Sequence, residues 1–246
     1  MSSVYLLGGG WDPAALPAMY GEFAAQVRAR GGRLAYVLQS GTPGTRFVDV
    51  FTQLGLTSVR RVTISARRSV AQRELRHADG IFVCGGSNPL YQSAFNDVAA
   101  EARQLVMADG VPYAGFSAGA VIAADRALLG GWRRRLPGLE VPVCAERRNE
   151  GIETIAAADG LGLVPFTVDV HGTQWGTVSR TLHAIHEGLV DDCYLVDENT
   201  ALTVRQGCAT VSGLNSVYRV WRTDAGIHAN VFPPGSRFEV LSGSGL

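Results

Sequence analysis

The serine of the pentapeptide Gly-Phe-Ser-Ala-Gly, Ser117, is the residue of this chain best placed to act as a nucleophile. It follows the apolar run VPYAGF and precedes AGAVIAA, so it is predicted where a strand turns into a helix. A G-x-S-x-G nucleophile elbow requires that context, because its glycines let strand and helix approach closely around the serine. The N–H of Ala118, at the helix start, could then stabilise a developing oxyanion. The alternative is that Ser117 only caps the helix.

A nucleophilic serine needs a base, and His171 is the histidine that the pattern favours. Among the five histidines, it is the one expected at the carboxyl end of a strand, FTVDVHG, and sites in parallel sheets form at those ends. The glycine-rich runs GGG at 8–10 and GGSN at 85–88 are predicted at the same edge. Asp169, two residues before the histidine, would point to the same face of its strand and could orient it or contact a substrate.

The run CYLVDENTALTV supplies candidates for the carboxylate that orients the base. Asp197 and Glu198 stand inside an apolar, strand-forming stretch, where a charge is costly unless it is paired. Either could complete a Ser-His-carboxylate arrangement. A plain hairpin turn at Asp-Glu-Asn is the competing interpretation.

An alternating α/β arrangement has to position these residues. In the first half of the chain, short apolar runs alternate with helical patterns, which indicates right-handed βαβ crossovers and a mostly parallel central sheet flanked by helices. Strands are expected at 4–10, 33–41, 59–64, 80–86 and 111–117, and helices at 13–30, 44–54, 69–78 and 88–108.

The pattern changes after a further helix at 117–125. Residues 126–164 are rich in Gly, Arg and Glu and are expected to loop over the surface. A strand at 166–172 and a helix at 176–188 follow. From residue 193 onward the chain is β-rich, which predicts antiparallel strands at one edge of the sheet. Because no linker or repeat interrupts the sequence, 1–246 is interpreted as one α/β domain.

Read in order, the motifs GGSN, YAGFSAGA, DVH and VDENTA resemble those of peptidase family S51, the dipeptidase E and cyanophycinase-like serine peptidases. The resemblance extends from about residue 4 to 205 and implies a class I glutamine amidotransferase-like (flavodoxin-like) fold. It implies that Ser117 is the nucleophile, His171 the general base and Glu198 the carboxylate of the cyanophycinase-like branch.

The same resemblance implies further site residues. The N–H groups of Gly86 and Ala118 would form the oxyanion hole, and Asn88, Asp169 and Arg180 would bind substrate. For Arg180, a salt bridge on a helix surface is an equally good interpretation.

Two departures from the family pattern indicate a divergent member. Trp175 and Thr177 stand where cyanophycinase-like members carry arginines, and GGSNP and DVH replace the GGNT and PH of dipeptidase E. The resemblance implies a small peptide or isopeptide substrate, of aspartyl or β-aspartyl type, with no cofactor and no metal. The resemblance also makes a homodimer a possible assembly, and the sequence leaves the oligomeric state open.

Composition excludes several other classes. The net charge is zero and the pI is about 7.0, so no overall electrostatic attraction to nucleic acid or to an anionic membrane is expected. No apolar run approaches the ~18 residues needed to cross a bilayer, and no signal peptide is recognisable at the start, so a cytoplasmic location is expected. All 22 basic residues are arginine, which excludes a Ser-Lys dyad, a Schiff-base enzyme and a Walker-type phosphate loop. The four cysteines contain no C-x-x-C pair, which argues against a zinc cluster.

Three other functions compete with the peptidase interpretation. An α/β-hydrolase esterase has the order Ser, Asp/Glu, His and would need Asp197 or Asp224 with His228, but too few βα units follow the elbow. Glutamine amidotransfer is disfavoured because its nucleophile is a cysteine. A non-catalytic binding protein that retained the fold stays open, because fold does not determine function.

Overall fold

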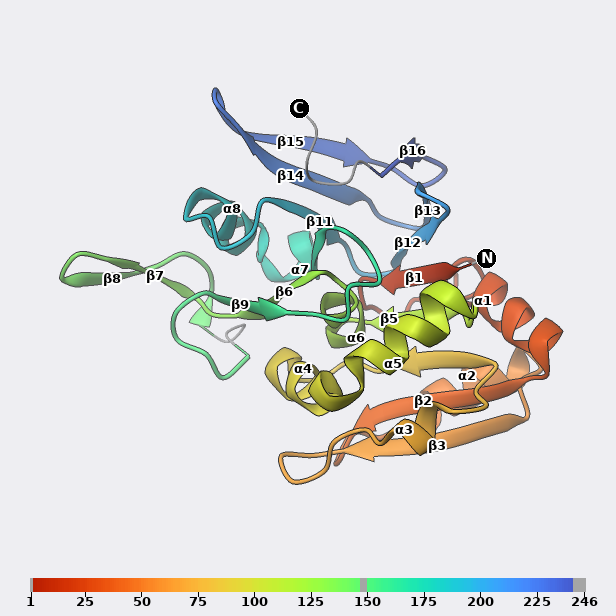
Figure 1. Ribbon diagram of the computed structural model, residues 1–246. Helices are drawn as coiled ribbons and strands as arrows, with labels where there is room; N and C mark the ends of the chain where they lie inside the picture. The colour runs from red at the N-terminus through yellow and green to blue at the C-terminus, as the bar shows by residue number, and fades with distance from the viewer. Residues whose placement is uncertain (1, 147–149, 241–246) are drawn as a thin grey trace.

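The computed structural model describes residues 2–146 and 150–240. Among these residues, eight strands form a large sheet in the order β16-β13-β12-β1-β5-β4-β2-β3 (Figure 1). The strands of its parallel part are β1 (Ser3–Leu7), β2 (Arg33–Gln39), β3 (Ser58–Ile64), β4 (Gly80–Val83) and β5 (Tyr113–Phe116). β1, β4 and β5 are buried along their whole length, as the continuous apolar runs predicted.

Helices connect and flank these strands. They are α1 (Leu16–Arg30), α2 (Thr45–Gln53), α3 (Gln72–Leu75), α4 (Asn88–Phe95), α5 (Ala99–Arg103) and α6 (Ala118–Ile122), with α4 and α5 toward the viewer in Figure 1. The helix expected at 88–108 is interrupted by a 3-10 turn at Asn96–Val98 and ends as a π-helical segment at Gln104–Ala108. The helix expected at 69–78 is reduced to the single turn α3.

The predicted antiparallel strands are divided between two sheets. In the large sheet, β12 (Thr200–Arg205), β13 (Cys208–Gly213) and β16 (Arg237–Glu239) extend the edge beyond β1. A second sheet has the order β10-β11-β14-β15, with strands β10 (Thr167–Val170), β11 (Asp192–Val196), β14 (Val217–Thr223) and β15 (Gly226–Phe232). β10 and β11 are parallel, and the other pairs are antiparallel. The predicted fold class, a mostly parallel central sheet flanked by helices with antiparallel strands at the C-terminal edge, is confirmed.

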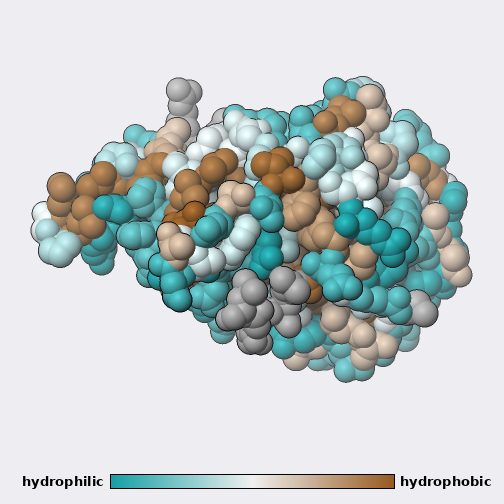
Figure 2. Space-filling model, turned by 90° about the horizontal axis from the view of Figure 1, so that it is seen from above, coloured by the Kyte–Doolittle hydropathy of each residue, from teal (hydrophilic) through white to brown (hydrophobic). Residues whose placement is uncertain are grey.

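The expectation that residues 126–164 only loop over the surface is wrong. β6 (Arg126–Gly130) pairs with β9 (Ala156–Asp159), and β7 (Arg133–Leu136) forms a hairpin with β8 (Leu139–Pro142). The hairpin projects from the body of the molecule, at the left of Figure 2. Its strands pair antiparallel, from Arg133 opposite Pro142 to Leu136 opposite Leu139. Arg133 and Arg135 both lie near Glu140, and this charged composition lacks the apolar alternation by which a strand is recognised in sequence.

A cluster of aromatic rings fills the space between the parallel strands and α1 and α2. Phe47 and Phe82 lie 4.8 Å apart between ring centroids, and Phe82 lies equally close to Phe51. Trp11, which follows β1, packs on Phe47 at 4.5 Å and so joins the core to the carboxyl edge of the sheet.

In the described part of the chain, no helix is long and apolar enough to cross a membrane.

Candidate active site

Ser117 lies in the sharp turn between β5 and α6, as the elbow motif predicted. Its backbone adopts φ 52° and ψ −111°, a conformation that is strained for a residue with a Cβ. The two glycines of the motif are required by close contacts: a Cβ on Gly115 would lie 2.2 Å from the carbonyl oxygen of Gly119, and one on Gly119 would lie 2.2 Å from that of Val83. Ser117 occupies the N-cap position of α6, but its hydroxyl makes no capping hydrogen bond.

The serine hydroxyl instead meets His171. The distance from Ser117 Oγ to His171 Nε2 is 2.8 Å. His171 directly follows β10, is 5% exposed and adopts a left-handed conformation with φ 57°. Gly9 makes room for the imidazole, since a Cβ there would lie 2.2 Å from His171 Cε1. On one face of the imidazole, the ring of Trp175 stacks at 3.7 Å and 6°.

Glu198 is the carboxylate that the structure brings to the histidine. The distance from its Oε1 to His171 Nδ1 is 2.8 Å. The adjacent carboxylate, Asp197, faces elsewhere and accepts hydrogen bonds from the backbone N–H and hydroxyl of Thr173 and from the Tyr218 hydroxyl. The two acidic residues therefore have different contacts. Asp197 holds the start of α7 (Gly172–Trp175), and Glu198 contacts the imidazole of His171.

The N–H groups of Gly86 and Ala118 are available for an oxyanion. Within the described residues, no hydrogen-bond acceptor contacts either of them. The loop that carries Gly86 is held by Gln39, whose Oε1 accepts a hydrogen bond from Ser87 N–H at 3.0 Å. A Cβ on Gly86 would lie 2.5 Å from the same Oε1, so this position requires glycine.

Asn88 is the first residue of α4, two positions after Gly86, and it is buried. Its Nδ2 donates to the Leu128 carbonyl, and its backbone N–H donates to Glu150 Oε2, both at 3.4 Å. These contacts connect the start of α4 to β6 and to Glu150. Asn88 is not among the described residues that line the cavity at Ser117.

The predicted substrate contacts of Asp169 and Arg180 are not supported by the structure. Asp169 is fully buried and accepts two hydrogen bonds from the Arg180 guanidinium, at 2.6 and 3.2 Å, and one from the Thr181 hydroxyl. Arg180, on α8 (Val178–His186), is 3% exposed. Neither residue lines the cavity at Ser117. Asp169 does not orient His171 either, because His171 turns away beyond the strand end.

A cavity of about 580 Å³ opens onto Ser117. It is lined by residues that follow β1, β2, β4 and β5, together with His171, Trp175 and Glu198. Its volume suits a small ligand such as a short peptide. In the described part of the chain, no three His, Cys, Asp or Glu side chains gather closely enough to hold a metal ion.

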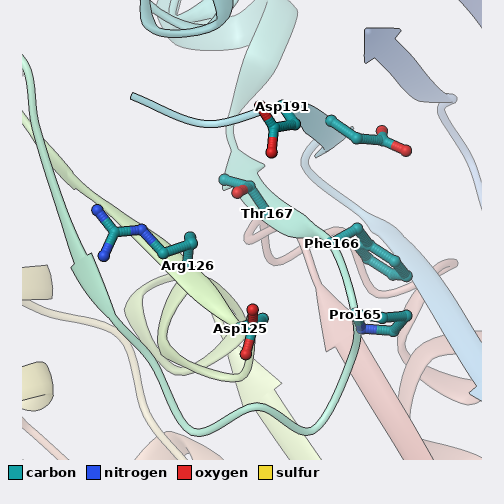
Figure 3. Close-up of a pocket in the computed structure, with 7 residues that line it drawn as sticks. Asp125, Arg126, Pro165, Phe166, Thr167 and Asp191 are labelled. Carbon is teal, nitrogen blue, oxygen red and sulfur yellow. The ribbon is translucent and has the colours of Figure 1, made fainter. Parts of the chain in front are cut away.

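A second cavity, of about 270 Å³, lies at the amino ends of β10 and β11, at the opposite end of β10 from His171 (Figure 3). Figure 3 shows that Asp125, Asp191 and Arg126 surround it. It shares no described residue with the cavity at Ser117. We therefore assign any chemistry of Ser117 to the larger cavity.

Cys84 also lines the larger cavity, and its thiol is not a rival nucleophile. Burial raises its pKa to about 11, so it is a neutral thiol at pH 7. We expect iodoacetamide at pH 7.5 to leave any turnover that depends on Ser117 unchanged over an hour, with Cys84→Ala as the matched control. Loss of activity in the wild type but not in Cys84→Ala would show that the thiol is accessible and ionised.

The esterase alternative does not fit this geometry. His228 lies on β15, the outer strand of the second sheet, and packs on Trp221.

Sequence reasoning missed two cavity residues, Trp11 and Arg46, which follow β1 and β2. The glycine run at 8–10 was the one signal that this edge of the sheet approaches the site.

Comparison with known proteins agrees with this arrangement. Residues 38–128, which include Ser117 and the Gly86 loop, match the model of Peptidase family S51. No curated protein is detectably similar in sequence.

Two solved structures share the fold. A peptidase from an acI-B1 Actinobacterium superposes with a TM-score of 0.65 at 14% identity, covering 97% of each chain. A putative peptidase E protein from Listeria monocytogenes EGD-e superposes with a TM-score of 0.55 at 19% identity, covering 87% of this chain and 100% of that one. With the family model matched by the segment that carries the elbow serine, the predicted resemblance to peptidase family S51 is confirmed.

Proposed function

We propose that this protein is a serine peptidase that hydrolyses a small peptide or isopeptide through an acyl-enzyme on Ser117. The observation that carries the proposal is the chain of two 2.8 Å contacts from Ser117 through His171 to Glu198, at the edge of a cavity. A hydroxyl, an imidazole and a carboxylate in this order are the parts that acyl transfer needs.

The geometry supports the following sequence of events. His171 Nε2 takes the proton of Ser117 as Oγ attacks the substrate carbonyl, and Glu198 stabilises the resulting imidazolium through Nδ1. The oxyanion accepts hydrogen bonds from the N–H groups of Gly86 and Ala118. His171 then gives its proton to the leaving amine. A water molecule attacks the ester by the same route and releases the acyl group, which restores Ser117.

Trp175 has a positioning role in this scheme. Its ring covers one face of the imidazole, which limits rotation of His171 and places a π-system against the imidazolium that forms. The arginines of cyanophycinase-like members would place cations here instead. This difference favours a small aspartyl or β-aspartyl peptide over an Asp-Arg polymer as the substrate.

The direct test is hydrolysis of a peptide panel by the purified protein, with products identified by mass spectrometry. The panel contains Asp-Xaa, β-Asp-Xaa, Glu-Xaa and neutral dipeptides, with an Asp-Arg polymer. Turnover that depends on Ser117 supports the proposal. Absence of turnover on the whole panel, together with retained peptide binding, would favour the non-catalytic alternative.

The two adjacent acidic residues offer a matched comparison. We expect Glu198→Gln to lower kcat about 10²–10⁴-fold with little change in KM, because the amide no longer stabilises the imidazolium. Asp197→Asn should lower kcat less than about tenfold and mainly reduce stability, by about 1–2 kcal/mol, since it weakens the hydrogen bonds that hold α7. Steady-state kinetics and urea unfolding distinguish the two effects. Equal losses of kcat would contradict the assignment of Glu198.

A further inference from the structure

The cavity at Ser117 is lined by an arginine, Arg46, whose guanidinium stacks on the indole of Trp11. The guanidinium carbon of Arg46, in the first turn of α2, lies 4.1 Å from the ring centroid of Trp11. Trp11 in turn packs on Phe47 at 4.5 Å and on Phe116 at 5.2 Å. These four residues all line the cavity, so this part of its wall is apolar and carries a positive charge.

Arg46 is available to a ligand. Apart from Cys84, the ionisable residues that line the cavity are Arg46, His171 and Glu198, and Glu198 is already bonded to His171. Among the ion pairs between described residues, none involves Arg46, and its side chain is exposed. A guanidinium that stacks on an indole keeps its N–H groups in the plane of the fork, where they can bind a carboxylate edge-on.

The position of His171 indicates which part of a peptide occupies this end. His171 must give its proton to the leaving amine, so the leaving residue has to lie on the side of Ser117 where His171 stands. His171 and Trp175 line the same cavity as Trp11 and Arg46. The loop after β1 that carries Trp11 also lies against the imidazole, since a Cβ on Gly9 would lie 2.2 Å from His171 Cε1. We therefore assign the part of the cavity formed by Trp11 and Arg46 to the leaving residue.

We propose that Arg46, supported by Trp11, binds the free α-carboxylate of the leaving residue, and that Phe47, Phe116 and Trp11 contact its apolar side chain. The substrates are then short peptides cleaved at their last bond, which releases one apolar or aromatic amino acid. This inference rests on the proposed function, because it assumes cleavage at Ser117.

The test compares peptides that differ only in the carboxylate. Asp-Phe and β-Asp-Phe are each paired with the corresponding C-terminal amide. In the wild type we expect kcat/KM to be about tenfold higher for the acid than for the amide, the lower end of the range for a charge-assisted hydrogen bond because Arg46 is exposed. In Arg46→Met the ratio should fall to near one, and in Arg46→Lys it should be intermediate. Arg67→Met, which changes an exposed arginine outside the cavity, should retain the wild-type ratio.

Binding to Ser117→Ala keeps this inference separate from the proposed function. Calorimetric titration of Ser117→Ala with Asp-Phe and its amide should show about tenfold tighter binding of the acid, and Ser117→Ala/Arg46→Met should remove the difference. If the acid binds more tightly only when Arg46 is present, yet no peptide is hydrolysed, the peptidase proposal fails and the carboxylate site stands. If peptides are hydrolysed through Ser117 but acid and amide are equal in both assays, the peptidase stands and the Arg46 site is overturned.

Discussion

Replacement of Ser117 by alanine is expected to lower kcat on the best peptide of the panel by about 10⁴–10⁶-fold. The mutation removes the attacking oxygen and leaves His171 without a proton to accept, while the N–H groups of the oxyanion site stay in place. Steady-state kinetics with product identification measures the loss. Turnover by Ser117→Ala within tenfold of the wild type would show that this hydroxyl is not the nucleophile.

The same position should also reveal the strain of the backbone at Ser117. Ser117→Ala keeps a Cβ at φ 52° and ψ −111°, whereas Ser117→Gly removes it, and both lose the hydrogen bond to His171. We therefore expect the glycine variant to be more stable than the alanine variant by about 1–2 kcal/mol in urea unfolding, although both are inactive. Equal stabilities would mean that the turn holds the serine without strain.

Removal of one partner of the buried Asp169–Arg180 ion pair is expected to destabilise the protein by about 3–5 kcal/mol. Asp169 is fully buried and Arg180 is 3% exposed, so Asp169→Ala removes a carboxylate that accepts hydrogen bonds from a buried guanidinium. The double variant Asp169→Leu/Arg180→Met should be less destabilised than Asp169→Ala, because it replaces both charged groups by apolar side chains. Urea unfolding monitored by circular dichroism provides the comparison.

An exposed pair of the same chemistry serves as the control. Arg126 and Asp159 lie 2.8 Å apart, but the Asp159 side chain is 90% exposed. Asp159→Ala should therefore change the free energy of unfolding by less than about 1 kcal/mol. If Asp169→Ala lowers the free energy of unfolding by no more than Asp159→Ala does, the buried pair does not stabilise the fold more than an exposed pair.

The elbow shows how much of the site could be predicted from sequence. A strand pattern, a G-x-S-x-G motif and a helix pattern are local signals, and they placed Ser117 correctly between β5 and α6. Glu198 was harder, because Asp197 and Glu198 are adjacent and only the crossing from β11 to β12, between two sheets, decides which of them faces His171.

Errors in the prediction arose where backbone direction changed or where strands were polar. Asp169 and His171 were expected on one strand face, but the left-handed conformation at His171 ends the alternation and separates the two side chains. The β7–β8 hairpin was missed because its strands carry arginine and glutamate side chains and have no buried face, so no apolar alternation marks them.

By itself, the sequence determined the alternating strands and helices of the first half of the chain, the mostly parallel sheet and the serine at its edge. These follow from periodicity and turn residues, which act over a few neighbouring positions. Only the tertiary structure decided that His171 reaches Ser117 and Glu198 reaches His171, that Arg180 pairs with Asp169, and that Arg46 and Trp11 share the cavity. The contacts of the site join segments 27 to 54 residues apart, and their geometry depends on how the two sheets pack, which no local pattern encodes.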